Sequence, residues 1–228
     1  GADERPSRGN PGLAGSQRQD RRRLRRDTAA HGGLFPEAKR GPRAAERKED
    51  MKNVLILAGS PRKKGNSAAL CRMFAQGAEE AGSKVETIFL RDKKIGFCLA
   101  CYHCRDHGGV CAIKDDMAEI LDKMNAADVI VMASPVYFYS VDAQMKALID
   151  RCVARWRTIK NKTFYYIMTS AEDSDTVMDT TLQCLRGLAL CLDGSVEGGV
   201  IYGKGVYEAG AIAGRPVMQE AYETGRRV

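Results

Sequence analysis

Four cysteines in one short stretch have the spacing of a metal or redox site. The stretch reads "CLACYHCRDHGGVC" and places Cys98, Cys101, Cys104 and Cys111 in a C-x2-C-x2-C-x6-C pattern. Each two-residue interval lets successive thiolates turn toward a common centre, as the ligands of a 4Fe-4S cluster must. Zinc more often uses two separated C-x2-C pairs, and a pair of metal-free thiols could cycle through a disulfide. We therefore predict a 4Fe-4S site and keep zinc and free thiols as alternatives.

The other residues of similar chemistry are interpreted as structural. His103 and His107 lie inside the cysteine stretch, where a surface or loop-packing role is expected. The single tryptophan, Trp156, follows a helical pattern and is expected to pack. The remaining four cysteines fall at helical positions among apolar neighbours: Cys71, Cys152, Cys184 and Cys191. Such thiols behave as small hydrophobic side chains, so we predict that all four are buried.

The stretch "GSPRKKGNS", residues 59–67, has the composition of a phosphate-binding loop. A nucleoside-triphosphate loop needs G-x-x-x-x-G-K-[ST], but here the second glycine comes one residue late and Asn66 stands in place of the lysine. The dinucleotide pattern G-x-G-x-x-G is also absent. A strand-to-helix turn of this kind suits one phosphate, because the first N–H groups of a helix are free and the helix dipole attracts an anion.

Four side chains of this loop are candidate phosphate ligands. Ser60, Asn66 and Ser67 can donate hydrogen bonds, and Arg62 can add a charge-assisted one. The alternative is an ordinary capped turn without a ligand. In either case the two lysines at 63–64 are expected to face water.

A second loop, "SPVYFYSVDAQ" over residues 134–144, places an aromatic cluster between an apolar run and a helical pattern. Aromatic and backbone groups at such a point suit a flat heteroaromatic ring, whose edge can accept N–H groups. The alternative is a loop whose aromatic side chains pack under a neighbouring helix or subunit.

The pair "LAGSPRKKGNS" and "ASPVYFYSVDAQMKALIDR" resembles the NADPH-dependent FMN reductase branch of the flavodoxin-like flavoproteins, over residues 51–228. The resemblance implies bound FMN with its phosphate on the four side chains named above. It also implies flavin-facing residues in two further places, namely Pro135, Val136, Tyr137 and Phe138 after the third strand and Thr169 and Ser170 after the fourth. After the fourth strand this chain has "TSAEDSD", where relatives more often have a glycine-rich turn.

Within that family, the cysteine pattern resembles the iron-sulfur flavoproteins, whose cluster lies close to the flavin. Some flavodoxin-like reductases keep such a motif without a cluster. The resemblance thus implies an FMN-dependent NAD(P)H oxidoreductase with a quinone, flavin or nitroaromatic acceptor, acting as a homodimer or tetramer. One alternative is an electron carrier between ferredoxin-type partners, and another is a flavin-binding sensor. No Ser-His-Asp set or catalytic carboxylate pair is evident, so we predict no catalytic side chain.

These loops must be held by an alternation of strands and helices. Short apolar runs predict five strands: Asn53 to Ala58, Lys84 to Leu90, Asp128 to Ala133, Thr163 to Met168 and Gly198 to Tyr202. Between them the apolar residues recur at helical spacing, and a last helix is expected from Pro216 to about Gly225. Strand-helix alternation predicts a doubly wound parallel sheet with ligands at the carboxyl ends of its strands. The flavodoxin-like strand order is 2-1-3-4-5, and the mixed second strand suits an edge.

The first 50 residues differ in composition from the rest. They hold 13 Lys and Arg against 8 Asp and Glu, and no Ile, Val, Met, Cys, Tyr or Trp. Such a segment cannot offset its ordering entropy, so we predict a disordered basic extension or upstream sequence before a candidate initiator, Met51. The run "RRRLRR" has no folded platform beside it, and no nucleic-acid partner is expected. The chain has no stretch of 18 apolar residues, which predicts a cytoplasmic protein without a membrane partner.

Overall fold

Residues 51–228 are described by the structure, a computed structural model, and the predicted extension over residues 1–50 lies outside them. Five strands form one parallel sheet in the order β2-β1-β3-β4-β5. The strands are β1 (Asn53–Ala58), β2 (Lys84–Phe89), β3 (Val129–Pro135), β4 (Thr163–Thr169) and β5 (Val196–Gly203). The helices are α2 (Asn66–Glu80), α3 (His103–Asp106), α4 (Met117–Ala126), α5 (Ala143–Arg151), α6 (Thr176–Leu190) and α7 (Pro216–Arg226), with short 3-10 helices η2 (Leu90–Asp92) and η3 (Cys152–Ala154). The predicted flavodoxin-like fold is confirmed, with β2 at an edge.

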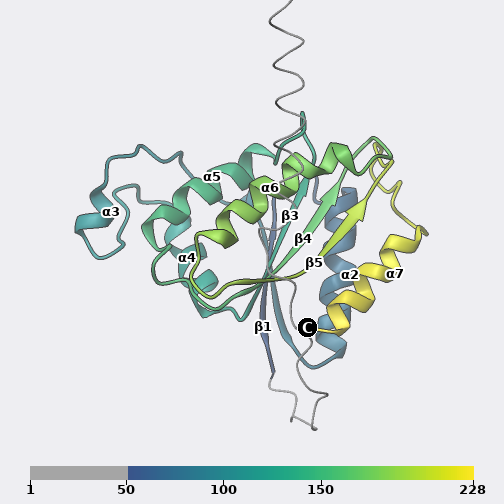
Figure 1. Cartoon of the computed structure of the whole chain (residues 1–228), viewed down its shortest axis with the longest axis horizontal. Helices are drawn as coiled ribbons and strands as arrows, with labels where there is room; N and C mark the ends of the chain where they lie inside the picture. The colour runs from purple at the N-terminus through teal and green to yellow at the C-terminus, as the bar shows by residue number, and fades with distance from the viewer. Residues whose placement is uncertain (1–50) are drawn as a thin grey trace, which may run out of the picture. The chain divides into compact units, whose positions relative to one another are not determined.

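Helices cover both faces of the sheet (Figure 1). On β1, Leu55 and Leu57 point into a core shared with α4, α5 and α6. Their neighbours Val54 and Ile56 point into a second core shared with α2 and α7. This is the period of two that a strand imposes, and burial on both sides explains why the central strands are apolar throughout.

Two glycines allow α2 and α7 to cross at very short range. A Cβ at Gly77 would lie 2.1 Å from the Tyr222 carbonyl oxygen, and a Cβ at Gly225 would lie 2.1 Å from the Phe74 carbonyl oxygen. Real Cβ atoms do not approach oxygen so closely, so any side chain at either position must push the helices apart. The crossing therefore depends on glycine in both helices.

A buried ion pair joins the two ends of residues 96–115, which we call the four-cysteine segment. The Arg151 guanidinium donates to both carboxylate oxygens of Asp115, at 2.7 and 2.9 Å, and to the Gly96 carbonyl oxygen at 2.8 Å. The Asp115 carboxylate also accepts the N–H groups of Gly96 and Met117. Burial alone would raise the pKa of Asp115, but these hydrogen bonds together hold it below its usual range. The segment is thus anchored where it leaves η2 and where it enters α4.

The prediction of four buried cysteines is half right. Cys71 and Cys152 are buried, and burial raises the pKa of each thiol to about 12, so both stay protonated. Cys184 and Cys191 are exposed, and the prediction is wrong for them. Cys184 lies on the outer side of α6 and Cys191 follows the last residue of the helix as its C-cap, whereas apolar neighbours such as Leu185 face the sheet. Apolar residues that are close to a cysteine in the sequence can therefore lie on a different face of the helix from it.

Candidate functional site

A cavity of about 140 Å³ lies at the carboxyl ends of the strands, where ligands of doubly wound sheets bind. In the strand order, β2 and β3 flank β1, so the chain switches direction at the neighbouring pair β1 and β3. The cavity lies over this point. Its walls come from loops after four strands: Ser60, Arg62, Gly65, Asn66, Ser67, Pro135, Val136, Tyr137, Thr169, Ala171, Val206 and Tyr207. Eight of the ten predicted cofactor residues are therefore brought together.

The first wall is the turn between β1 and α2. The Ser60 hydroxyl oxygen accepts the Arg62 N–H at 3.2 Å, and the Gly65 N–H donates to the Arg62 carbonyl oxygen at 2.9 Å. In the described part of the chain, the N–H groups of residues 66–68 have no acceptor, because the first helical bond runs from Ala69 to Gly65. Three free donors at the start of a 15-residue helix, beside the Arg62 side chain, form a site for one phosphate group.

The Asn66 amide, predicted to bind phosphate, is used for another purpose. Its nitrogen donates to the Glu208 carbonyl oxygen at 2.9 Å, and its oxygen accepts the N–H groups of Gly210 and Ile212 at 3.1 and 3.3 Å. The side chain therefore fixes the loop after β5 against the phosphate turn. Only the main chain of Asn66 is left to contact an anion.

The two lysines of the turn face water, as expected. Both are exposed, and Lys63 forms an ion pair with Asp92 at 2.6 Å. The Arg62 guanidinium donates to the Tyr207 carbonyl oxygen at 3.3 Å and keeps its other donors free for a ligand. Of the three cationic side chains in this turn, Arg62 therefore lines the cavity, and the two lysines do not.

The aromatic loop after β3 forms a two-residue hairpin turn. Tyr137 and Ser140 exchange hydrogen bonds at 2.9 and 3.0 Å, and the residues between them, Phe138 and Tyr139, both have positive φ. A positive φ strains the backbone of aromatic residues, and strained backbone of this kind is often found at ligand sites. Tyr137 lines the cavity, whereas Phe138 is fully exposed and lies outside it. The predicted role of Phe138 in holding the ring is therefore not supported within one chain.

The third loop, after β4, contributes less than predicted. Thr169 lines the cavity, and its carbonyl oxygen accepts the Val136 N–H at 2.8 Å, which ties the two loops together. The Ser170 hydroxyl donates instead to the Glu172 carbonyl oxygen at 2.6 Å, and Ser170 does not line the cavity. Its role is to shape the turn.

A buried carboxylate, that of Asp142, lies between the phosphate turn and the aromatic loop. Asp142 accepts the Ser134 hydroxyl at 2.7 Å and the Met145 N–H at 3.0 Å, which caps α5. A Cβ at Gly59 would lie only 2.3 Å from this carboxylate. Burial raises the pKa of Asp142, although its hydrogen bonds act in the opposite direction. The glycine of the phosphate turn is thus required by the carboxylate beneath it.

Four cavity residues were not predicted. Gly65 and Ala171 belong to loops that also hold predicted residues. Val206 and Tyr207 come from a different loop, the one after β5. The sequence could have predicted the residues after the fifth strand, since the carboxyl end of that strand lies at the same edge of the sheet as those of the others.

The predicted cluster ligands lie in a separate place. Cys98 and Cys101 are exposed, Cys104 and Cys111 are half-buried, and none is in a disulfide. None of them lines the cavity, and Figure 1 shows α3 apart from the strands, on the side of α4 and α5. Within residues 51–228, no three Cys, His, Asp or Glu side chains lie together as a metal site requires. Four thiols are the right donors for a cluster, but this geometry does not assemble them, and the ligand set stays a prediction.

The histidines of the segment have a structural arrangement. The rings of His103 and His107 stack with centroids 3.7 Å apart, and the His107 ring nitrogen is 2.8 Å from the His103 carbonyl oxygen. The two rings thus pack on each other, as the predicted packing role requires.

The fold and the cavity define a flavodoxin-like protein with a site for a phosphate-bearing ligand at its switch point. The family model of the NADPH-dependent FMN reductases matches residues 52–191, more than half of the chain. The chain belongs to this family of flavin-dependent oxidoreductases.

Its curated relatives carry a more specific name. It is 45% identical over 98 residues to an iron-sulfur flavoprotein of Methanocaldococcus jannaschii, covering 43% of this chain and 50% of the relative. It is 42% identical over 109 residues to an iron-sulfur flavoprotein of Methanosarcina thermophila, covering 46% and 56%. The chain thus spans about half the length of the curated relatives it matches. Among solved structures, an FMN-dependent NADH-azoreductase of Bacillus anthracis aligns with a TM-score of 0.59 at 17% identity, over 77% of this chain and 98% of that one, which shows a shared fold.

Proposed function

We propose that the protein is an FMN-dependent NAD(P)H oxidoreductase that passes electrons to a small acceptor such as a quinone, a flavin or a nitroaromatic compound. The observation that carries the proposal is the cavity at the switch point. It combines three free helix N–H groups with Arg62 on one wall and the aromatic loop on another. Membership of the FMN reductase family supports FMN as the ligand and NAD(P)H as the donor.

The residues present fit FMN in distinct ways. The N–H groups of residues 66–68 and the Arg62 guanidinium would hold the phosphate, and Ser60 and Ser67 line the same end. Pro135, Val136 and Tyr137 would border the flavin ring. Bound FMN would supply the redox chemistry, namely hydride transfer from the reduced nicotinamide and electron transfer to the acceptor. The protein binds and orients the cofactor, and we assign no nucleophile or general base.

The test compares two flavins that differ in the phosphate alone. Anaerobic titration of flavin-free protein should show FMN binding at least about 100-fold more tightly than riboflavin, because several charge-assisted hydrogen bonds are lost together. The loaded protein should oxidise NADH or NADPH with a quinone acceptor faster than free FMN does. Equal affinity for the two flavins would refute the phosphate site. Turnover no faster than free FMN would favour the flavin-binding sensor.

A second candidate is an iron-sulfur flavoprotein that relays electrons between ferredoxin-type partners. It is favoured by the intact four-cysteine segment and by the names of the curated relatives. Anaerobic purification with iron and FMN analysis decides it. Cys101→Ser should abolish cluster iron and the broad absorbance near 400 nm that a cluster adds to the flavin spectrum, whereas the exposed Cys184→Ser, outside the segment, should do neither. Iron near zero in the parent protein would remove the cluster and with it this candidate.

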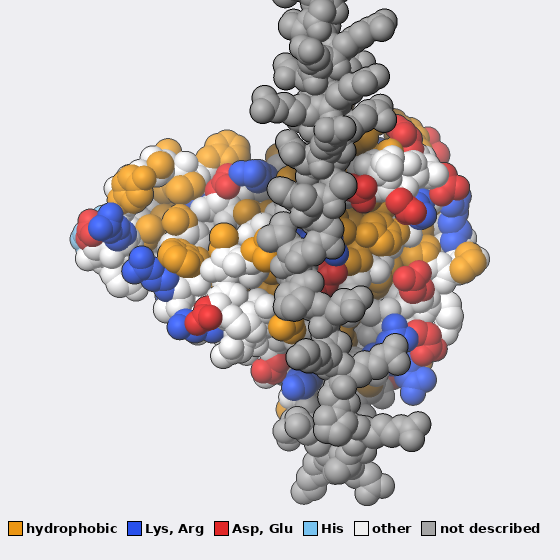
Figure 2. Space-filling view, in the orientation of Figure 1, with side chains coloured by type: hydrophobic (Ala, Val, Ile, Leu, Met, Phe, Trp, Pro, Cys, Tyr) orange, Lys and Arg blue, Asp and Glu red, His pale blue; other side chains and the backbone are white. Residues whose placement is uncertain are grey.

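Cytoplasmic location and a homodimer or tetramer complete the proposal. Among the described residues, no helix combines the length and apolar character needed to cross a bilayer. Figure 2 shows hydrophobic side chains gathered over the lobe that carries α3. Phe97 and Leu99, which precede α3 in the chain, are both exposed. Apolar patches of this kind are often covered by another subunit. Sedimentation equilibrium should give a mass of at least two chains, and a monomer at working concentration would contradict this.

A further inference from the structure

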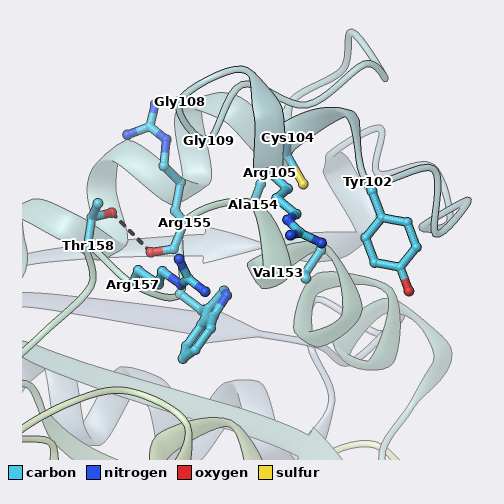
Figure 3. A pocket seen from close by; sticks show the side chains of 11 residues that line it. Tyr102, Cys104, Arg105, Gly108, Gly109, Val153, Ala154, Arg155, Arg157 and Thr158 are labelled. Carbon is cyan, nitrogen blue, oxygen red and sulfur yellow. Dashed lines mark hydrogen bonds between the residues drawn. The ribbon is translucent and has the colours of Figure 1, made fainter.

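A second cavity, separate from the cofactor cavity, lies between the four-cysteine segment and the chain that follows α5. Its volume is about 440 Å³, within the range of small-molecule sites. Figure 3 shows Tyr102, Cys104 and Arg105 coming from the four-cysteine segment, and Arg155, Arg157 and Thr158 from the opposite wall. It shares no lining residue with the cofactor cavity.

Three arginines and no acidic residue line this cavity. In the described part of the chain, neither Arg105 nor Arg157 has a carboxylate partner. Arg155 pairs with Asp122 at 3.2 Å, but its buried Nε has no hydrogen-bond partner. Guanidinium groups that lack a carboxylate are ready to bind one, or a phosphate or sulfonate, in a bidentate manner.

The rest of the lining suits a flat ring. The half-exposed Trp156 indole lies beside the cavity with the Arg157 guanidinium 5.2 Å from its ring centroid, and the exposed Tyr102 lines the other side. Gly109 packs directly on Arg155, since a Cβ there would lie 3.0 Å from the Arg155 Cδ. Together with Val153 and Ala154 these small residues leave an apolar floor. Aromatic and guanidinium planes of this kind bind planar rings by stacking.

We propose that this cavity binds a planar aromatic anion, a ring system that carries a sulfonate, carboxylate or phosphate group. The guanidinium groups of Arg105 and Arg157 hold the anion, and the ring lies over the apolar floor beside Trp156. Because Cys104 lines the same cavity, a ligand there contacts the predicted redox segment directly. The proposal is independent of FMN binding, since no residue of the cofactor cavity takes part.

The test uses anthraquinone-2-sulfonate as the probe and 2-(hydroxymethyl)anthraquinone as its uncharged counterpart. Calorimetric titration of FMN-saturated protein measures affinity, and the emission of Trp156 reports the place, because it is the only tryptophan of the chain. We expect a saturable site whose occupancy quenches Trp156, and this site should bind the sulfonate at least about tenfold more tightly than the uncharged compound. Arg105→Gln and Arg157→Gln should each weaken the sulfonate by about tenfold.

The matched control is Arg226→Gln on α7, an exposed arginine that also lies over an aromatic ring, with its guanidinium 6.0 Å from the Tyr222 centroid. Its affinity should stay within about twofold of the parent. Equal affinity for the charged and uncharged probes would overturn the proposal, and so would unchanged sulfonate affinity in Arg105→Gln and Arg157→Gln. It would also be overturned if binding of the sulfonate changed the flavin absorbance and left the Trp156 emission unchanged. Protein that fails to retain FMN is titrated in the same way, so a failed cofactor proposal and a failed second site give different results.

Discussion

Single residues around the cofactor cavity divide into those that face the ligand and those that hold the loops. Arg62 and Tyr137 face the cavity, whereas the side chain of Asn66 and the hydroxyl of Ser170 are used within the protein. Both kinds are polar, and both follow a strand. Their roles differ because an amide or hydroxyl near several main-chain groups satisfies those groups before it contacts a ligand.

The first prediction separates two neighbouring cations of the phosphate turn. Arg62→Gln should weaken FMN about tenfold, because a charge-assisted contact to the phosphate is lost. Lys64→Gln should change affinity by no more than about twofold, since Lys64 is exposed and outside the cavity. Quenching of flavin fluorescence on titration gives both affinities. Riboflavin, which lacks the phosphate, should bind the two variants equally. A larger loss of FMN affinity in Lys64→Gln than in Arg62→Gln would contradict the assignment of Arg62 to the phosphate.

The second prediction concerns the buried carboxylate below the loops. Asp142→Ala should lower the free energy of unfolding by about 2 kcal/mol, because a helix cap and the Ser134 hydrogen bond are both lost. Asp142→Asn keeps a capping oxygen and should cost less than about 1 kcal/mol at pH 7. Urea denaturation measures both, and equal costs would contradict a capping role.

The same carboxylate should show a defined pH dependence. Burial raises the pKa of Asp142, so the folded state binds its proton more tightly than the unfolded state does. Its contribution to stability is therefore greatest below the unfolded pKa and falls as the pH rises through the folded pKa. Relative to Asp142→Asn, the parent protein should lose stability as the pH rises above about 4, the unfolded pKa of an aspartate. An opposite slope would mean that the hydrogen bonds outweigh burial.

At the scale of elements, helix packing depends on where a glycine lies. Gly77 lies at the crossing of α2 and α7, while Gly187 on α6 has no atom within 4 Å of the place where a Cβ would stand. Both are helical glycines, and helix propensity alone predicts that alanine stabilises each. Only contact with another element distinguishes them.

The third prediction uses this pair as variant and control. Gly77→Ala should lower the free energy of unfolding by more than about 2 kcal/mol, because the helices must separate and their buried contacts loosen. Gly187→Ala should raise it by about 0.5–1 kcal/mol through the loss of unfolded-state entropy. Thermal and urea unfolding measure both changes. A stabilised Gly77→Ala would show that the crossing is wider than described.

At the scale of the whole molecule, described over residues 51–228, one buried ion pair connects the sheet domain to the four-cysteine segment. Arg151 and Asp115 have side chains 1% and 9% exposed, so neither charge is well hydrated, and each depends on the other. Loss of one partner leaves the other buried without compensation. The attachment of the segment that carries both the cysteines and the second cavity depends on this pair.

The fourth prediction follows from that dependence. Asp115→Asn should lower the free energy of unfolding by about 3 kcal/mol, whereas Asp150→Asn, in an exposed pair with Lys146, should change it by less than about 0.5 kcal/mol. The pKa of Asp115 is lowered, so its contribution is complete above the unfolded pKa and is lost as the pH falls through the folded pKa. Hydrogen exchange of residues 96–115 in acid should rise before that of the sheet. Simultaneous exchange would contradict a local anchor.

The sequence by itself determined the fold class, the strand order by resemblance, and the edge at which a ligand binds. Apolar runs and helical periods follow from local chemistry, and a parallel sheet places every strand end at one edge. Tertiary structure alone decided which polar atoms were free, because that depends on groups distant in the chain, such as the loop after β5 that occupies the Asn66 amide. It also decided that Cys184 faces outward and that Arg105 and Arg157 line the same second cavity. Spacing along the chain reports local turns, whereas exposure and convergence depend on which elements pack together.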